Sequence, residues 1–489
     1  MSNASKITSG GHSGQPDALP ARAKAAPKGT SSIYRAVWRW HFYAGLLILP
    51  FMIMMAITGA AYIYRDEIDD WVYSDLKFVT QMDVPPLPMS TQIDAVRYFV
   101  GDTPVKIIPP ASPDRSTEIV IATSGGDKRA VYVDPYTGLV LGSMPDRGTV
   151  MWLIRRIHSL AEFGTIPNYI IEIASGWSIL LVATGMYLWW PQANQKGGVV
   201  TLRDTPKRRR WWRDAHAVTG IFIGLFIVFM AGTGMFWSVF WGKYANEFAN
   251  GTPNGYPSGV RVDVPLSTVP MIEAFGDTGW TTENMPVPLS VDGGPLATGT
   301  TAAALTQTQP QPQPQTRIGI DTAIARFTEL GIAPGYAISL PKGETGVYSA
   351  SVYPNDLDQQ RVIHLDQYSG RTLINMGYHD YGIFGRIMEL GINIHMGQEF
   401  GVLNQIFLLV ICALIVFMSV SAGVMWWKRR PAGSIGIPPL PRNARSMTIV
   451  AAILAIGGII YPTVGASMIV IWLLDWLFVA RPARAMRTA

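Results

Sequence analysis

The chain has 489 residues, of which 48% are hydrophobic and only 15% charged, and its formal net charge is +5. This apolar content excludes an ordinary soluble enzyme, while the charged residues exclude a protein that lies wholly within a membrane. The single cysteine, Cys412, excludes a disulfide framework. Membrane and soluble parts are therefore both expected.

Four uncharged apolar runs are long enough to cross a bilayer as helices, for which about 17–25 residues are needed. A further apolar stretch, Met447–Leu474, is interrupted by Pro462 and Gly465, so the sequence predicts two short helices in a hairpin there. The number of crossings in this hairpin is left open. The four predicted spans are Phe42–Tyr64, Ile173–Trp190, Ala215–Trp241 and Val402–Trp427.

Charge predicts the orientation of these spans. The segments before the first span, between the second and third, and after the fourth are rich in Lys and Arg, so they are expected in the cytoplasm, whereas residues 65–165 and 242–400 are relatively acidic and are expected outside. The first run reads as a retained signal anchor behind a disordered cytoplasmic tail. The predicted segments are the tail 1–32, the first span 33–65, an external domain 66–150, a helix entrance with the second span 151–191, a basic loop 192–213, the third span 214–242, a second external domain 243–385, a helix entrance with the fourth span 386–428, a loop 429–446, the hairpin 447–480 and a cytoplasmic tail 481–489.

Four histidines occupy matched positions in an internal repeat. His158 and His395 each begin the pattern His-x3-Glu-Phe-Gly, and each precedes a second tryptophan by 32 positions, at Trp190 and Trp427. His41 and His216 open the first and third spans, and each is followed four residues later by glycine and 17 residues later by a Thr-Gly pair. One histidine thus lies at an end of each span, which indicates a pair of cofactor sites.

The two external segments also share a pattern. Strand-like runs end in Asp134-Pro-Tyr-Thr-Gly138 and Asp366-Gln-Tyr-Ser-Gly370, which is typical of a strand that enters a tight turn. Each segment is predicted to be a small α+β module, with a surface loop of low complexity at 296–316 in the second. The predicted amphipathic helices are Ser90–Val100 and Asp321–Leu330, and the predicted strands include Val105–Ile108 and Val347–Val352.

These strand ends, together with spans that finish in Met-Trp-Trp-Lys-Arg-Arg-Pro at 425–431, resemble the PepSY-associated transmembrane family of bacterial inner-membrane proteins. The resemblance covers roughly residues 33 to 480. It implies an α-helical membrane protein with a four-helix core, a C-terminal helical hairpin and two external PepSY-like domains. The family includes iron-regulated proteins and di-haem reductases of ferric siderophores, in which histidines of the membrane helices ligate b-type haem.

The resemblance implies two non-covalent b haems. Covalent attachment is excluded because no C-x-x-C-H motif is present. His41 and His216 are expected to ligate one haem near the cytoplasmic face, where Gly45 and Gly220 on the same helix faces allow a flat macrocycle to lie close to the backbone. The alternative is that each histidine merely sits at the lipid headgroup level. Pairing within one half instead of across the halves is also left open.

His158 and His395 are expected to ligate the second haem near the external face. Glu162 and Glu399, four residues further on, are expected to orient the imidazoles or to manage protons. Two alternatives remain: a His2Glu2 site for zinc or non-haem iron, or a turn that only shapes the helix entrance.

Several arginines lie near the histidines, and Arg39 and Arg156 are the main candidates for binding haem propionates. No special role is expected for His364, on the outer face of a strand. His379 is expected in a plain loop, and the alternative is that it contacts substrate. Trp189, Trp190, Trp426 and Trp427 fit an interfacial aromatic belt. The other candidate arginines are Arg35, Arg155, Arg213 and Arg386.

The expected function is an inner-membrane haem-dependent ferric-siderophore reductase that carries electrons from the cytoplasm to the periplasm. Its expected partners are a ferric siderophore, a flavodoxin- or ferredoxin-like donor and the lipid bilayer, with no nucleic acid. No Gly-rich nucleotide-binding fingerprint is present. Two alternatives remain: a non-enzymatic PepSY protein that binds peptides or restrains a protease, and a haem sensor or quinol-linked oxidoreductase.

Overall fold

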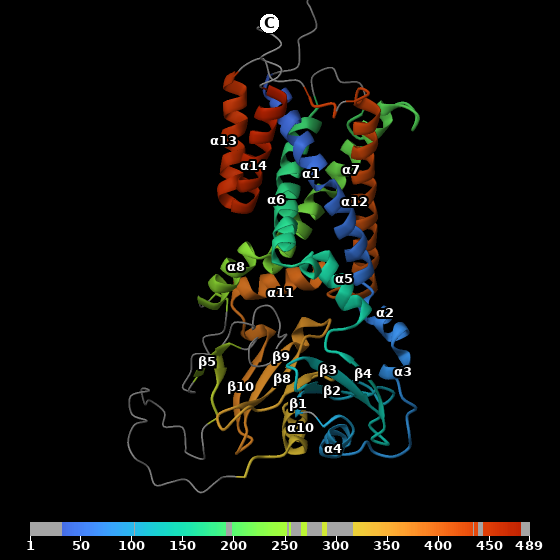
Figure 1. Ribbon diagram of the computed structural model, residues 1–489, viewed down its shortest axis with the longest axis vertical. Coiled ribbons are helices and arrows are strands. Elements are labelled where there is room, and N and C mark those ends of the chain that lie inside the picture. The colour runs from blue at the N-terminus through green and yellow to red at the C-terminus, as the bar shows by residue number, and fades with distance from the viewer. Residues whose placement is uncertain are drawn as a thin grey trace, which may run out of the picture.

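The computed structural model describes residues 32–101, 103–191, 198–251, 254–255, 266–270, 286–290, 316–433, 435–438 and 444–480. The predictions for the two tails and for the loop 296–316 lie outside these residues, except at Ser32 and Thr316. From top to bottom in Figure 1, the described elements form a helical bundle, a layer of short helices, a β-sheet and two helices beneath the sheet.

The bundle contains four helices that are long and apolar enough to cross a membrane, so the chain is a multi-pass membrane protein. All four predicted spans are confirmed. Three of the helices begin six to ten residues before the apolar run, because the polar residues at their ends continue the helix beyond the hydrocarbon-length segment. The helices are α1 (Ser32–Tyr62), α6 (Thr165–Trp189), α7 (Arg209–Gly234), which continues as a 3₁₀ turn to Trp237, and α12 (Gly401–Arg429).

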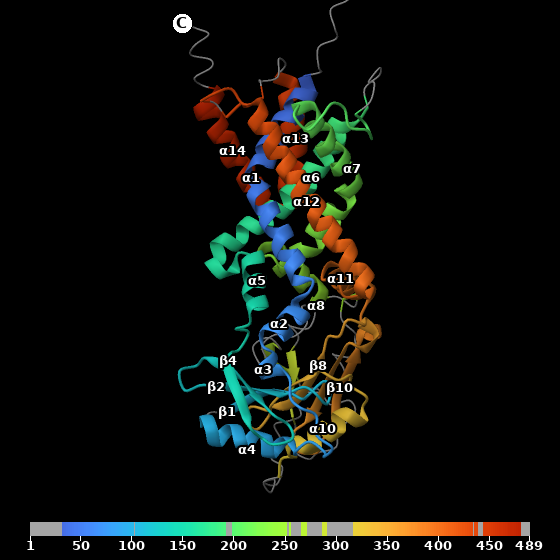
Figure 2. The same ribbon diagram turned by 90° about the vertical axis from the view of Figure 1, so that its right-hand side faces the viewer.

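Packing places α1 and α7 on one diagonal of the bundle, since each contacts both α6 and α12. Apolar side chains fill the centre, where the rings of Trp40 and Trp177 stack with centroids 6.4 Å apart. The end of the bundle where α1 begins carries the basic segments, and the opposite end faces the sheet (Figures 1 and 2). We call these the basic end and the sheet end.

The predicted C-terminal hairpin is confirmed as α13 (Ala444–Ile460) and α14 (Pro462–Asp475). Pro462 is the first residue of α14, where its missing N–H leaves no helical hydrogen bond unmade. Gly465 lies inside α14 and does not break it. Its role is close packing, because a Cβ there would come within 2.8 Å of the Gly458 carbonyl oxygen on α13.

Three short helices lie between the bundle and the sheet: α5 (Val150–His158), α8 (Phe240–Gly251) and α11 (Ile383–His395) (Figures 1 and 2). Two more, α2 (Arg65–Val72) and α3 (Ser74–Lys77), continue from α1 toward the sheet. Helix α5 packs against α1 and α11 packs against α7, so each diagonal helix of the bundle has one short partner at the sheet end.

The sheet corrects the expectation of two separate external modules. Its eight antiparallel strands run in the order β10-β9-β8-β7-β1-β2-β3-β4, and β1 joins the two halves by pairing with β7, Ile107 opposite Ile338. The strands are β1 (Thr103–Ile108), β2 (Thr117–Ala122), β3 (Lys128–Val133), β4 (Val140–Pro145), β7 (Ala337–Ser339), β8 (Val347–Val352), β9 (Arg361–Asp366) and β10 (Thr372–Gly377), and the separate pair is β5 (Leu266–Pro270) with β6 (Pro286–Pro288).

Helices α4 (Met89–Val100) and α10 (Ile320–Glu329) cover the face of the sheet that lies away from the bundle (Figure 1). Side chains from both helices and both halves of the sheet form one core, which includes the fully buried Val96 and Phe327. Because this core is shared, we expect the two halves to fold as one unit.

Both Asp-x-Tyr-[Ser/Thr]-Gly patterns form the predicted turns. The Asp134 carboxylate accepts the Tyr136 N–H at 2.8 Å, and the Asp366 carboxylate accepts the Tyr368 N–H at 3.0 Å. Gly138 and Gly370 follow with φ of 72° and 67°, a conformation that glycine adopts without strain. The two patterns therefore close the β3–β4 and β9–β10 hairpins.

Candidate functional site

His158 and His395 are the last residues of α5 and α11, and each is held by a threonine of the neighbouring membrane helix. The Thr58 hydroxyl lies 2.8 Å from Nδ1 of His158, and the Thr233 hydroxyl lies 2.7 Å from Nδ1 of His395. Each threonine also donates its single proton to the carbonyl four residues earlier, at Met54 and Phe229. A hydroxyl that donates to this carbonyl can only accept from the imidazole, and this assignment places the proton on Nδ1.

Hydrogen bonds between Nδ1 and an oxygen atom also hold the histidines at the basic end. Thr184 of α6 lies 2.9 Å from Nδ1 of His41 and donates to the Leu180 carbonyl. Nδ1 of His216 lies 3.0 Å from the Met418 carbonyl of α12, which can only accept. Both rings are therefore protonated at Nδ1.

All four imidazoles consequently present an unprotonated Nε2. Among the described residues, none of these Nε2 atoms makes a hydrogen bond. A neutral imidazole whose Nδ1–H is fixed by an oxygen acceptor is the usual form of a histidine that binds a metal through Nε2. The chemistry of the four histidines therefore fits axial ligation of haem iron.

The histidines lie in two pairs that match the prediction across the halves. His41 and His216 come from the diagonal helices α1 and α7 and are electrostatic neighbours. His158 and His395 line one cavity of about 720 Å³, which we call the histidine cavity. A volume of this size lies within the range of cofactor and ligand pockets, about 300–1,000 Å³.

Burial keeps the cavity pair neutral. It lowers the pKa of His158 to about 4 and that of His395 to about 3, and the neighbouring His158 contributes to the shift at His395. The inner wall is apolar and includes Met52, Ile227 and Leu408. Such a wall excludes water and favours a largely apolar macrocycle.

Glycines bring the helix backbones close to the imidazoles. A Cβ on Gly59 would lie 3.4 Å from Cε1 of His158, and one on Gly234 would lie 3.5 Å from Cε1 of His395. At the basic end a Cβ on Gly185 would lie 3.3 Å from Cε1 of His41 in the same way. Gly45 and Gly220 are the glycines predicted to let a macrocycle lie close to the backbone. A Cβ on Gly45 would meet no atom within 4 Å, which leaves that space open. A Cβ on Gly220 would lie 3.6 Å from Sδ of Met418 in the α7–α12 contact.

The two glutamates do not orient the imidazoles by direct contact, and a role in managing protons stays a prediction. The Glu162 carboxylate pairs with Arg156, and the Glu399 carboxylate accepts the Asn393 amide at 2.6 Å, so neither contacts an imidazole. Within the described part of the chain, no cluster of three or more His, Cys, Asp or Glu could hold a metal ion. The His2Glu2 alternative therefore has no assembled ligand set among these residues.

The arginines divide between the cavity and other contacts. Arg156 and Arg155 line the histidine cavity, which fits a role toward a propionate, although Arg156 also binds Glu162. Arg39 does not fit that role, because the residue is only 2% exposed and its guanidinium pairs with Asp475 of α14. Arg213 pairs with Asp214 at 2.8 Å.

Of the two remaining histidines, His364 is placed differently from the prediction, whereas His379 lies in the loop between β10 and α11 as predicted. His364 is buried between β8 and β9 rather than on an outer face, and its Nδ1 lies 2.5 Å from the Ser349 hydroxyl. His379 lies in a 3₁₀ turn and pairs with Asp358 at 3.0 Å. Trp190 and Trp427 are 69% and 62% exposed at the basic end, as expected for a membrane interface.

Four hydroxyl residues that hold the imidazoles were not predicted. Thr58 and Thr233 stand 17 residues after His41 and His216, but their partners are the other pair of histidines. Thr184 and Ser421 each stand 26 residues after His158 and His395, and Ser421 lies 3.2 Å from Nδ1 of His216. Equal spacing of hydroxyl residues in the repeat is the signal that would have identified them.

Comparison with known proteins agrees with this architecture. The model of the PepSY-associated TM region matches residues 38–429, which is most of the chain. No curated protein sequence matches it. The match extends from the first membrane helix to the end of the fourth, so the chain belongs to the PepSY-associated transmembrane family.

Proposed function

We propose that this protein is a di-haem b oxidoreductase of the bacterial inner membrane that reduces ferric siderophores on the periplasmic side and releases ferrous iron. One observation carries the proposal: four half-buried imidazoles lie in two pairs at two levels of one bundle, and each has Nδ1 within 3.0 Å of a hydroxyl or carbonyl oxygen, the arrangement that leaves Nε2 for a metal. Four histidines retained only for packing would have no reason to share one tautomer.

His41 and His216 would hold one haem near the basic end, and His158 and His395 would hold the other in the histidine cavity. A b haem held by two histidines would supply a one-electron couple, which suits electron transfer to an external acceptor. The protein's part is orientation and exclusion of water. Thr58 and Thr233 fix the imidazole rings, and Trp237 packs edge-on against His395 with centroids 6.1 Å apart.

The proposed direction of electron transfer rests on the distribution of basic residues. The basic segments at one end would face the cytoplasm by the positive-inside rule, and the sheet would then lie in the periplasm. A flavodoxin- or ferredoxin-like protein is the proposed electron donor, since an acidic carrier would be attracted to that basic surface. Reduction to ferrous iron weakens binding by hard oxygen ligands, so the siderophore would release its metal.

The first test is the spectrum of the purified protein. A Soret band and a pyridine haemochrome of two b haems per chain are expected. A colourless protein would overturn the proposal and would favour a PepSY module that binds peptides or restrains a protease.

The second test concerns the acceptor. Protein reduced with dithionite should be reoxidised within a stopped-flow trace on mixing with ferric siderophores. A haem-loaded protein that none of them reoxidises would reject this substrate class and would favour a haem sensor or quinol-linked oxidoreductase.

A further inference from the structure

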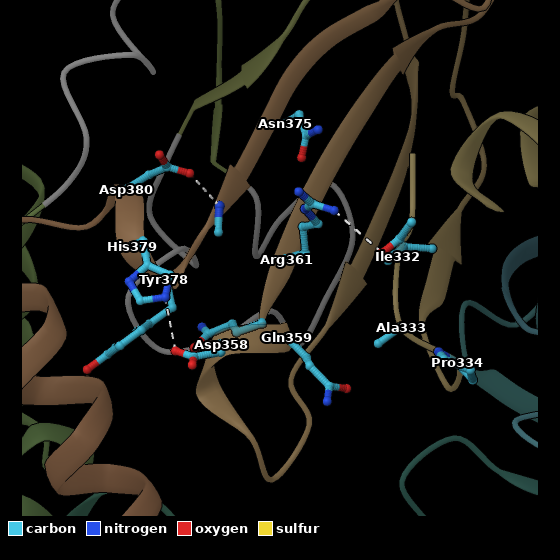
Figure 3. Close-up of a pocket in the computed structure, with 13 residues that line it drawn as sticks. Ile332, Ala333, Pro334, Asp358, Gln359, Arg361, Asn375, Tyr378, His379 and Asp380 are labelled. Atoms are coloured by element: carbon cyan, nitrogen blue, oxygen red, sulfur yellow. Dashed lines mark hydrogen bonds and ion pairs between the residues drawn. The ribbon is translucent and has the colours of Figure 1, made fainter. Parts of the chain in front are cut away.

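A second cavity, of about 620 Å³, opens at the edge of the sheet and shares one wall with the histidine cavity. We call it the outer pocket. It is lined by the loop 331–334 after α10, the short segment 358–361 that begins β9, and the end of β10 with the turn that follows it (Figure 3). Its volume lies in the range of small-molecule sites, about 300–1,000 Å³.

Gln360 separates the two cavities, because it is a lining residue of both. It is only 2% exposed, and its amide nitrogen lies 3.3 Å from the Tyr381 hydroxyl. The amide oxygen has no hydrogen-bond partner among the described residues. A buried acceptor without a partner is unfavourable, so a donor from a bound molecule is expected there.

The charges of the outer pocket are balanced locally. His379 pairs with Asp358, and Figure 3 shows these two side chains pointing toward one another. Asp380 accepts the backbone N–H of Gly377 at 2.8 Å, and Arg361 donates to the Leu330 carbonyl at 2.9 Å. Together these four side chains carry a formal charge of −1 when His379 is neutral and zero when it is protonated.

A pocket without net positive charge does not favour a strongly anionic ligand. Its remaining polar side chains are Tyr378, whose hydroxyl donates to the Arg386 carbonyl, and amides, including Gln359 and Asn375, whose side chain makes no hydrogen bond to the described residues. Amides donate and accept, so they suit a neutral or weakly cationic molecule that carries amide and hydroxyl groups.

We propose that the outer pocket binds the ferric chelate that accepts the electron, and that it prefers neutral or weakly cationic chelates with amide groups over multiply anionic ones. This inference rests on the proposed function, since the chelate needs an electron source on the other side of Gln360. The electron reduces ferric to ferrous iron and no covalent bond is made.

Binding is tested with a redox-inert probe, the gallium(III) complex of a neutral trihydroxamate chelator, by calorimetry on the full-length protein. Asn375→Trp fills the pocket from an exposed position of β10 and should weaken binding at least tenfold. Ser143→Trp is the matched control, because Ser143 is the exposed residue before the buried Met144 on β4, as Asn375 is before Met376 on β10. Equal affinity in Asn375→Trp and the control would overturn the site, as would a wild-type protein that does not bind the probe.

The charge preference of the pocket is tested with Asp358→Asn, which removes one negative charge at an exposed position. The affinity for a trianionic gallium tris-catecholate should rise about threefold, the effect of one unit charge at about 7 Å in salt solution. An unchanged or lower affinity for the anionic complex would overturn the charge argument.

Different results would contradict the proposed function and the outer pocket. A protein without haem, or one that no ferric chelate reoxidises, contradicts the proposed function. If the reduced wild-type protein is reoxidised, and Asn375→Trp is reoxidised at the same rate at subsaturating chelate, the outer pocket is excluded while the function stands.

Discussion

Thr233 accepts a hydrogen bond from Nδ1 of His395 at 2.7 Å while it gives its own proton to the Phe229 carbonyl at 2.8 Å. A threonine on α7 thereby fixes the orientation of an imidazole on α11, a helix outside the bundle. Thr58 does the same between α1 and His158 of α5. His158 and His395 are thus oriented by the membrane helices and not by the sheet.

Thr233→Val should therefore weaken haem binding at the histidine cavity. Valine keeps the shape of threonine but cannot accept from Nδ1–H, and loss of such a partner typically costs about 10–100-fold in metal affinity. The haem content and midpoint potentials of the purified variant measure the effect. Thr233→Ser is the matched control, because it retains the hydroxyl and should remain close to wild type. Equal haem retention and equal potentials in both variants would show that the hydrogen bond has no role in ligation.

Pairing across the halves makes a prediction about haem stoichiometry. His41→Ala should remove about half of the haem, and His41→Ala with His216→Ala should remove no more, since both ligands belong to one site. His41→Ala with His395→Ala should remove all of it. Pyridine haemochrome assays of the three variants measure these amounts. Complete loss in the His41/His216 double variant would contradict two independent sites.

The sequence predicted the parts of this protein that depend on local pattern. Hydrophobic length indicated the four spans, and the repeat indicated the two pairs of matched histidines. The joining of β1 to β7 was not predictable in this way, because pairing between edge strands depends on tertiary packing. The i, i+4 spacing of His158 and Glu162 suggests contact along a helix, and this suggestion is wrong. The chain turns after His158, where Leu160 has φ of 56°, and Glu162 is directed to Arg156.

His364 should make the sheet sensitive to acid. Burial lowers its pKa to about 3, whereas an unfolded chain would have the ordinary value of about 6.5. As the pH falls below about 6.5 the unfolded state binds a proton that the folded state does not, so stability falls. The loss between pH 6.5 and 5 should be about 1.6 kcal/mol.

His364→Gln tests this prediction, because glutamine can still bond to the Ser349 hydroxyl but does not titrate. Thermal unfolding of the sheet, followed by circular dichroism at pH 7 and pH 5, should show a smaller decrease in Tm for the variant than for wild type. An identical decrease in the two proteins would mean that His364 is protonated in the folded state.

Asp475 should be essential for attaching the hairpin to the bundle. Its carboxylate receives hydrogen bonds from the Arg39 guanidinium and the Tyr43 hydroxyl, both on α1. Asp475→Asn leaves a buried cation without its partner, which costs about 3–5 kcal/mol in comparable sites. A large decrease in Tm in detergent is expected, and Arg39→Gln added to Asp475→Asn should recover part of it. Asp94→Asn removes the carboxylate of an exposed pair with Arg97 and should change stability by less than about 1 kcal/mol. If Asp475→Asn is no more destabilising than this control, the ion pair does not hold the hairpin, and the apolar contacts of α13 and α14 with the bundle must do so.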